Sequence, residues 1–196
     1  MEGNVEVEKN HERKAAPDGR IYYSYADVHK TLENMVPEIK KFKPDLILAI
    51  GGGGYIPARI LRSYLKVPIL AISLELYNDA TETMCSEVKK IQWFDETTEI
   101  ARDMFKKKVL IVDEVDDTRT TLEYCVQEVI KTNTPRAIGV AVIHNKLKKK
   151  KGKFPANVSY FVGENVPDKW NCYPWEAVNY GHDIETHEAL AAKGRA

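Results

Sequence analysis

Short runs of apolar residues alternate with segments of helical period along the middle of the chain. Five such runs have the length of strands that are buried on both faces of a sheet. They lie at residues 46–50, 69–74, 109–112, 138–143 and 158–162. Between them, apolar positions recur every three or four residues at 57–66 and 118–132, as in amphipathic helices. Alternating strands and helices predict an α/β fold, an open doubly wound parallel sheet with helices on both faces.

The first part of the chain separates into a tail and a helix. Residues 1–20 have mixed charge and no apolar period, which predicts a flexible N-terminal tail before a domain over residues 21–196. Ser24 or Asp27 can cap a helix over the following apolar positions, and Pro37 is expected to kink or shorten its end.

The composition excludes several classes of protein. Of the 196 residues, 43% are hydrophobic and 30% are charged, which is typical of one globular domain. The 29 basic and 29 acidic residues cancel, so net charge gives no reason to expect a nucleic-acid partner. No apolar run reaches the ~18 residues of a membrane helix, so we expect no membrane partner and a cytoplasmic location.

The sequence VDEVDDTRTTL, residues 112–122, places four carboxylates where a buried strand ends. Ligands of doubly wound sheets bind beyond the carboxyl ends of the strands. Thr118, Thr120 and Thr121 lie at the start of a predicted helix, where free backbone amides and the helix dipole favour a phosphate group. The carboxylates beside it suggest sugar hydroxyls or Mg²⁺ as ligands, and the alternative is that water solvates them.

The sequence IGGGGYIPAR, residues 50–59, places four glycines between a strand and the helix that Pro57 starts. Glycines at such a position let backbone amides approach an anion closely. The run does not match the dinucleotide-binding pattern G-x-G-x-x-G, and it lacks the Gly-Lys-Ser/Thr of a P-loop. A flexible connector is the alternative interpretation.

An apolar strand followed by two acidic residues and D-T-x-x-T resembles the signature of the type I phosphoribosyltransferases, which bind 5-phosphoribosyl-1-pyrophosphate. With VPDKW at 166–170 and PWE at 174–176, the chain looks most like the fungal-type hypoxanthine-guanine and xanthine enzymes of that family. The resemblance covers roughly residues 21–176. It implies phosphoribosyl transfer to a 6-oxopurine in purine salvage, Mg²⁺ as cofactor, a small hood formed by the terminal segments, and a homodimer or homotetramer.

The resemblance also implies which residues bind the sugar and its phosphates. Asp113 and Glu114 would bind the ribose hydroxyls and, with Glu176, the metal. The 5-phosphate would be held by the loop residues Asp117, Thr118, Arg119, Thr120 and Thr121. The pyrophosphate would be held by Gly51, Gly52, Gly53, Gly54 and Arg59. The family's non-proline cis peptide would here be the bond between the first two of these glycines.

Two positions depart from the family's pattern. Many members have Gly where this chain has Arg119, whose side chain either reaches the phosphate or faces solvent. Relatives often have Lys at the position of Gly52, which leaves Arg59 as the candidate source of positive charge.

For the base, the resemblance assigns three residues. Lys146 would donate a hydrogen bond to the 6-oxo group, which selects against adenine because its 6-amino group is itself a donor. Trp170 would stack on the purine, although a Trp is by itself more often part of a core. The backbone of Asn171 would contact the purine edge.

Two residues are expected to act at the reacting centre. Asp117 matches the general base, which accepts a proton from nitrogen 7 of the purine. The polar segment 75–98 has the place of the family's mobile loop, and Tyr77 is either the residue that this loop brings to the centre or a fixed tyrosine at a strand end.

Two rival functions keep the sugar site. One is a non-catalytic regulator that keeps the nucleotide site and binds RNA through the lysines at 148–151, which we otherwise interpret as a solvated hairpin tip. The other is a phosphoribosyltransferase for another base. Hypoxanthine, guanine and xanthine are equal candidates, because the choice depends on the pocket around position 2 of the purine.

Overall fold

The structure is a computed structural model that describes residues 13–78, 86–95 and 97–195. The chain divides into two compact units. The larger is residues 29–167, and the smaller combines residues 1–28 with residues 168–196. The two are described in turn.

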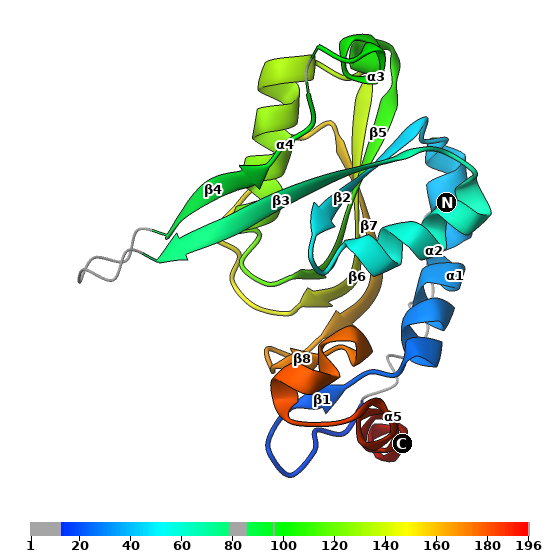
Figure 1. Ribbon diagram of the computed structural model, residues 1–196, viewed down its shortest axis with the longest axis vertical. Helices are drawn as coiled ribbons and strands as arrows, with labels where there is room; N and C mark the ends of the chain where they lie inside the picture. The colour runs from blue at the N-terminus through cyan, green and yellow to red at the C-terminus, as the bar shows by residue number, and fades with distance from the viewer. Residues whose placement is uncertain (1–12, 79–85, 96, 196) are drawn as a thin grey trace, which may run out of the picture. The chain divides into compact units, whose positions relative to one another are not determined.

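The larger unit contains a six-stranded sheet in the order β4-β3-β2-β5-β6-β7 (Figure 1). Its strands are β2 (Leu46–Gly51), β3 (Ile69–Asn78), β4 (Ser86–Gln92), β5 (Lys108–Asp116), β6 (Ala137–Lys146) and β7 (Val158–Val166). All neighbouring strands are parallel except β3 and β4, which are antiparallel. From β2 the chain crosses first to β3 on one side and then to β5 on the other, so the strand order reverses between β2 and β5. The doubly wound sheet is thereby confirmed.

Each predicted strand exists, and most continue beyond their apolar run. β5 and β6 extend into polar sequence, with Asp116 paired to Asn145, because backbone ladders need no apolar side chain. The prediction of a loop from residue 75 to 98 is wrong in part. Residues 75–78 and 86–92 are strands, while residues 79–85 lie outside the described part. The charged residues of β4 made its sequence resemble a loop, although charged residues are common on edge strands.

Helices cover both faces of the sheet (Figure 1). They are α1 (Tyr25–Phe42), α2 (Tyr55–Leu65), α3 (Glu99–Arg102), the 3₁₀ helix η1 (Asp103–Lys106) and α4 (Thr120–Asn133). α4 buries Leu122 and Val126 in one cluster with Ile138 and Val140 of β6. Gly139 faces the other way, toward Phe42 of α1, so α1 and α4 lie on opposite faces.

The observed helix ends differ slightly from the predicted ones. Ser24 caps α1 in a reciprocal pair with Asp27: the Ser24 backbone N–H donates to the carboxylate, and the Asp27 N–H donates to Ser24 Oγ. Pro37 does not shorten α1, which continues to Phe42. α2 begins two residues before Pro57, so that proline stands in the first turn but not at its start.

The smaller unit joins the two terminal segments, which agrees with the expected hood. It comprises β1 (Ile21–Tyr22), β8 (Asn171–Cys172), the 3₁₀ helix η2 (Pro174–Tyr180) and α5 (Ile184–Gly194), and β1 pairs in parallel with β8. Of the tail expected at residues 1–20, residues 1–12 lie outside the described part. Residues 13–20 make specific contacts, including an ion pair between Arg13 and Asp27 and a hydrogen bond from the Tyr22 hydroxyl to Asp18.

Within the described ranges, no helix has the length and apolar character needed to span a bilayer.

Candidate active site

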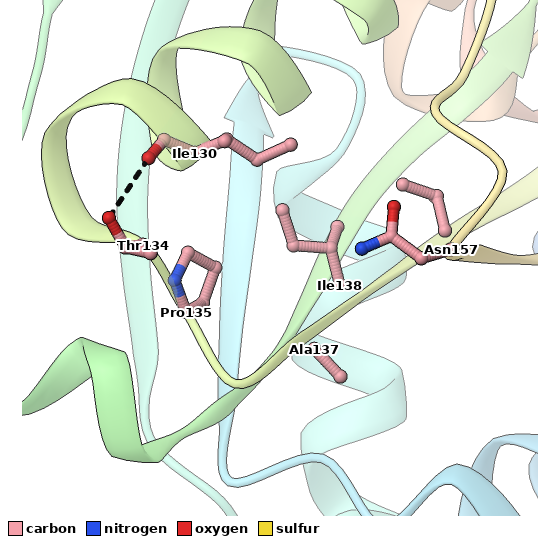
Figure 2. A pocket seen from close by; sticks show the side chains of 7 residues that line it. Ile130, Thr134, Pro135, Ala137, Ile138 and Asn157 are labelled. Atoms are coloured by element: carbon pink, nitrogen blue, oxygen red, sulfur yellow. Dashed lines mark hydrogen bonds between the residues drawn. The ribbon is translucent and has the colours of Figure 1, made fainter.

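A small cavity in the larger unit lies at the wrong end of the sheet for catalysis. It has a volume of about 140 Å³ and lies between the end of α4 and the first residues of β6 and β7 (Figure 2). Its lining is mainly apolar, and its Thr134 hydroxyl already donates to the Ile130 carbonyl, at 3.3 Å. Since ligands of such sheets bind beyond the carboxyl ends of the strands, the site is to be sought at the opposite end.

At the carboxyl ends, the glycine run after β2 packs against the acidic end of β5. A Cβ atom at Gly53 would lie 1.7 Å from Glu114 Oε2, and one at Gly54 would lie 2.3 Å from the carbonyl oxygen of Val112. Close approach of two backbones therefore requires glycine at position 54, whereas at position 53 the Glu114 side chain would have to move, and this packing argues against a mere flexible connector. The Gly51–Gly52 peptide bond is cis, as expected. Around Gly52 there is open space, because its Cβ would meet no atom within 4 Å.

Asp113 and Glu114 lie in β5 at the switch point of the sheet, which is the place between β2 and β5 where the strand order reverses. Asp113 is buried, and its Oδ1 accepts a hydrogen bond from the Glu114 backbone N–H at 2.9 Å. Burial raises the pKa of Asp113 well above its usual range, and the neighbouring Glu114 carboxylate adds to that shift. A ligand that brings positive charge or hydroxyl donors would favour the ionised form of this carboxyl group.

Asp117 lies one residue beyond β5 and next to the last residue of β6. Lys146 is 9% exposed, and its Nζ lies 3.5 Å from Asp117 Oδ1; Lys148 Nζ lies 2.9 Å from the same oxygen. Burial alone would raise the pKa of Asp117, but the ammonium groups of Lys148 and Lys146 outweigh it and lower that pKa below its usual value. Asp117 is therefore an ionised proton acceptor at neutral pH, beside a buried donor.

The loop from Asp117 to Thr121 leads into the N-terminus of α4, which starts at Thr120. The Thr118 and Thr120 hydroxyls lie 2.9 Å apart. Free backbone amides, two hydroxyls and the positive end of a 14-residue helix are thus collected in one turn. This arrangement suits a phosphate group.

Arg119 adopts the left-handed conformation, with φ of 68° and ψ of 4°. Glycine adopts this conformation at little cost, which accounts for the Gly that many members have here. The Arg119 side chain points neither to solvent nor along the loop. Its Nε and Nη2 donate to Asp116 Oδ2 at 2.9 and 2.7 Å, so a contribution of this residue to phosphate binding would come from its backbone N–H.

The elements that carry this candidate site lie within a region that matches a known family. A family model described as the phosphoribosyl transferase domain matches residues 20–177. The chain belongs to the phosphoribosyltransferase family. A hypoxanthine-guanine phosphoribosyltransferase of Schizosaccharomyces pombe is 43% identical over 200 residues, which cover 89% of this chain and 95% of that protein. Xanthine phosphoribosyltransferase 1 of Saccharomyces cerevisiae is 41% identical, over 90% of this chain and 97% of its own length.

A solved structure is similar to this phosphoribosyltransferase over nearly its whole length. It is a hypothetical protein from Neisseria gonorrhoeae with bound ppGpp, at a TM-score of 0.80 and 41% identity. The similarity covers 95% of this chain and 100% of the Neisseria chain. The similarity therefore includes most of both units.

The lysine-rich segment of this phosphoribosyltransferase is not a solvated hairpin tip throughout. Besides the contact of Lys148 with Asp117, Lys150 Nζ donates to the carbonyl oxygens of Asp116, Asp117 and Lys146 at 2.6, 2.9 and 2.9 Å. Sequence reasoning missed Lys150, because four consecutive lysines carry no signal that distinguishes one from another. Asp116 was likewise left unassigned among four neighbouring carboxylates.

Of two further residues expected in the site, Arg59 is not brought to it, and the side chain of Tyr77 is not described. Arg59 is exposed on α2, and its guanidinium donates to Ser63 Oγ at 2.8 Å, one turn further from the glycine run. Tyr77 lies in β3 with its backbone paired to Glu87. Its side chain lies outside the described part, so its assignment stays a prediction.

The smaller unit carries the residues expected at the base. Trp170 is 63% exposed, so the core interpretation is wrong for it. The carbonyl groups of Trp170 and Cys172 accept hydrogen bonds from β1, so the backbone groups of Asn171 between them point to the opposite edge. Neither polar atom of the Asn171 side-chain amide has a hydrogen-bond partner among the described residues. Glu176 Oε2 accepts a hydrogen bond from the Tyr180 hydroxyl at 2.8 Å.

Proposed function

We propose that this phosphoribosyltransferase transfers the phosphoribosyl group of 5-phosphoribosyl-1-pyrophosphate to a 6-oxopurine, in purine salvage. The observation that carries the proposal is the contact between Lys146 and Asp117 at the ends of two adjacent strands. A buried ammonium and an ionised carboxylate side by side suit a base that offers an oxygen acceptor and a ring N–H. The names of the two yeast relatives, which cite hypoxanthine, guanine and xanthine, support the same class of base.

In this mechanism the base is activated by removal of one proton. Asp117 accepts the proton from nitrogen 7 while nitrogen 9 forms a bond to C1 of the ribose. The bond from C1 to the pyrophosphate oxygen breaks, and the pyrophosphate leaves with the bonding electron pair. Lys146 donates to the 6-oxo group, which discriminates against adenine because two donors would then face each other.

The other substrate is held at the switch point. Asp113 and Glu114 accept hydrogen bonds from the ribose hydroxyls, and the carboxylates favour the positive charge that develops on the ribose as its bond to pyrophosphate breaks. The amides and hydroxyls of residues 117–121 bind the 5-phosphate. The backbone of the glycine run, which packs on Glu114, binds the pyrophosphate.

Mg²⁺ fits this donor set as an ion that the protein and the substrate would bind together. Asp113 and Glu114 offer the carboxylate oxygens that it prefers, and Glu176 is a third candidate from the resemblance. No cluster of three or more His, Cys, Asp or Glu side chains poised to hold a metal is found among the described residues. The remaining ligands would come from substrate and water, as is common for Mg²⁺, whose charge would neutralise the pyrophosphate. Removal of Mg²⁺ with EDTA is expected to abolish turnover, and addition of the ion should restore it.

The remaining assignments are proposed on the resemblance. Trp170 stacks on the purine, the Asn171 backbone contacts its edge, and Tyr77 comes to the reacting centre. The exposure of Trp170 and the direction of the Asn171 backbone support the first two. A homodimer or homotetramer and a cytoplasmic location stay predictions.

Pyrophosphate release tests the proposal. The purified chain is incubated with Mg²⁺, phosphoribosyl pyrophosphate and one base at a time: hypoxanthine, guanine, xanthine, adenine, uracil or orotate. Activity with one or more of the first three alone is the expected result, and it ranks these bases in one experiment. Turnover of adenine or a pyrimidine instead would replace the proposed base. Absence of turnover together with salt-dependent RNA binding would favour the regulator.

A guanine nucleotide is a second candidate ligand of the same site. The similar Neisseria structure contains ppGpp, which carries a 6-oxopurine and phosphates at its 5-position. We infer that ppGpp competes here with phosphoribosyl pyrophosphate, because both would occupy the turn at the start of α4. Competitive inhibition of pyrophosphate release is the expected result. Inhibition that phosphoribosyl pyrophosphate cannot overcome would place ppGpp elsewhere.

A further inference from the structure

The lysine loop, which we define as residues 147–153, packs against the loop that leads into α4. The backbone N–H groups of Lys151 and Gly152 both donate to the Thr118 carbonyl, at 2.9 and 3.2 Å. Gly152 allows this approach, since a Cβ there would lie 2.5 Å from the Arg119 carbonyl oxygen. Two segments far apart in sequence are therefore joined at the turn that would bind the 5-phosphate.

Lys150 is the side chain at the centre of this junction. Its ammonium group donates to three carbonyl oxygens, those of Asp116, Asp117 and Lys146. It also lies 3.4 Å from the buried carboxylate oxygen Oδ1 of Asp116. An ammonium group has three N–H donors, so each of them has a partner here.

Two of the three carbonyl oxygens belong to residues with proposed roles in the reaction. Asp117 is the proposed general base, and Lys146 is the proposed donor to the base. Their backbones belong to different segments, one after β5 and one at the end of β6. A single ammonium group thus holds the main chains of Asp117 and Lys146 in one arrangement. The side chains of the same two residues meet with Lys146 Nζ 3.5 Å from Asp117 Oδ1.

We propose that Lys150 is a positioning residue for phosphoribosyl transfer, which sets the general base against the donor to the 6-oxo group without contacting substrate. This inference rests on the proposed function. Misplacement of a reacting group by about 1 Å can cost about 10²-fold in rate. Loss of Lys150 should therefore affect catalysis and base selection together.

The test compares Lys150→Met with Lys151→Met. Methionine keeps most of the stem length but removes all three donors, and Lys151 is an exposed neighbour in the same loop. We expect Lys150→Met to lower kcat/KM by about 10²-fold, to raise KM for phosphoribosyl pyrophosphate, and to reduce selection of hypoxanthine over adenine. Lys151→Met should stay near wild type in all three.

The selectivity ratio and KM separate positioning from folding. A variant that merely folds less well has fewer active molecules, which lowers apparent kcat but leaves KM and the selectivity ratio unchanged. That result for Lys150→Met would overturn the proposal, as would equal effects of the two variants.

Amide hydrogen exchange gives a readout without turnover. Residues 117–121 should exchange faster in Lys150→Met than in wild type, and at the wild-type rate in Lys151→Met. Unchanged protection in Lys150→Met would overturn the proposal. If the wild type turns over no base at all, the proposed function fails, and exchange still decides whether Lys150 holds this loop.

Discussion

Replacement of Arg119 by glycine sets two opposite effects against each other. A non-glycine residue in the left-handed conformation costs roughly 1–2 kcal/mol, which Arg119→Gly would recover. Part of this gain is offset, because glycine in the unfolded chain has more freedom to lose, by about 0.5–1 kcal/mol. From the backbone alone, the variant should be slightly more stable than wild type.

The side chain reverses that expectation. Asp116 is fully buried, and Arg119 provides two of its hydrogen bonds while lying 4.6 Å from the ring centre of Phe154. Breaking a buried ion pair costs about 3–5 kcal/mol. The low end applies, because Tyr160 and Lys150 still face the Asp116 carboxylate. We therefore expect a net loss of about 2 kcal/mol in the free energy of unfolding.

Urea unfolding followed by circular dichroism measures this difference, and thermal unfolding checks it. For a chain of this size, a loss of about 2 kcal/mol corresponds to a fall in Tm of roughly 4–8 °C. Asp116→Asn with Arg119→Gly completes a double-mutant cycle, in which the double variant should lose less than the sum of the single ones. An Arg119→Gly protein at least as stable as wild type would refute the argument that the buried pair outweighs the backbone strain.

Four further predictions address the base, the pyrophosphate and the smaller unit. Asp117→Asn should lower kcat by ~10²–10⁴-fold with little change in KM for phosphoribosyl pyrophosphate, and an unchanged kcat would remove the general base. Lys146→Ala should reduce selection of hypoxanthine over purines without a 6-oxo group by at least about 10-fold, in competition assays; undiminished selection would place specificity elsewhere. Gly52→Lys should lower KM for phosphoribosyl pyrophosphate, because the position has open space and the added charge favours pyrophosphate; a KM that does not fall contradicts this. Burial lowers the pKa of His187 from 6.5, so the unfolded chain takes up the proton first and the free energy of unfolding should fall as pH drops below 6.5. His187→Gln should weaken this dependence in urea unfolding at pH 5 and 7, and an identical slope in both proteins would assign it to another group.

Much of the sheet and the turn at the start of α4 could be predicted, because each depends on local sequence. Buried parallel strands need continuous apolar runs, and a phosphate turn needs small polar residues at a helix start. Both signals are contiguous in residues 109–122. The edge strand β4 was missed because its sequence, SEVKKIQ, has only two apolar residues, Val88 and Ile91, whose spacing of three does not show the period of two that marks a strand.

The contacts around Asp116 could not be predicted, for a different reason. Two of them, those of Tyr160 and Lys150 with Asp116, join residues more than 30 positions apart. Nothing in the local pattern separates Asp116, whose side chain is fully buried, from Asp117, whose side chain is half-exposed. The left-handed backbone at Arg119 was equally hidden, since the departure from glycine was visible but the direction of its side chain was not.

The ladder between β5 and β6 has a consequence for how the family can vary. Asp116 pairs with Asn145, so Asp117 and Lys146 each follow the same rung of the ladder by one residue. Backbone pairing, and not the packing of the two side chains, thus determines how far apart Asp117 and Lys146 lie. Insertion of one residue within either strand would move one partner by about 3.3 Å and turn it to the other face, which no contact of the Lys150 ammonium group with the two main chains could compensate.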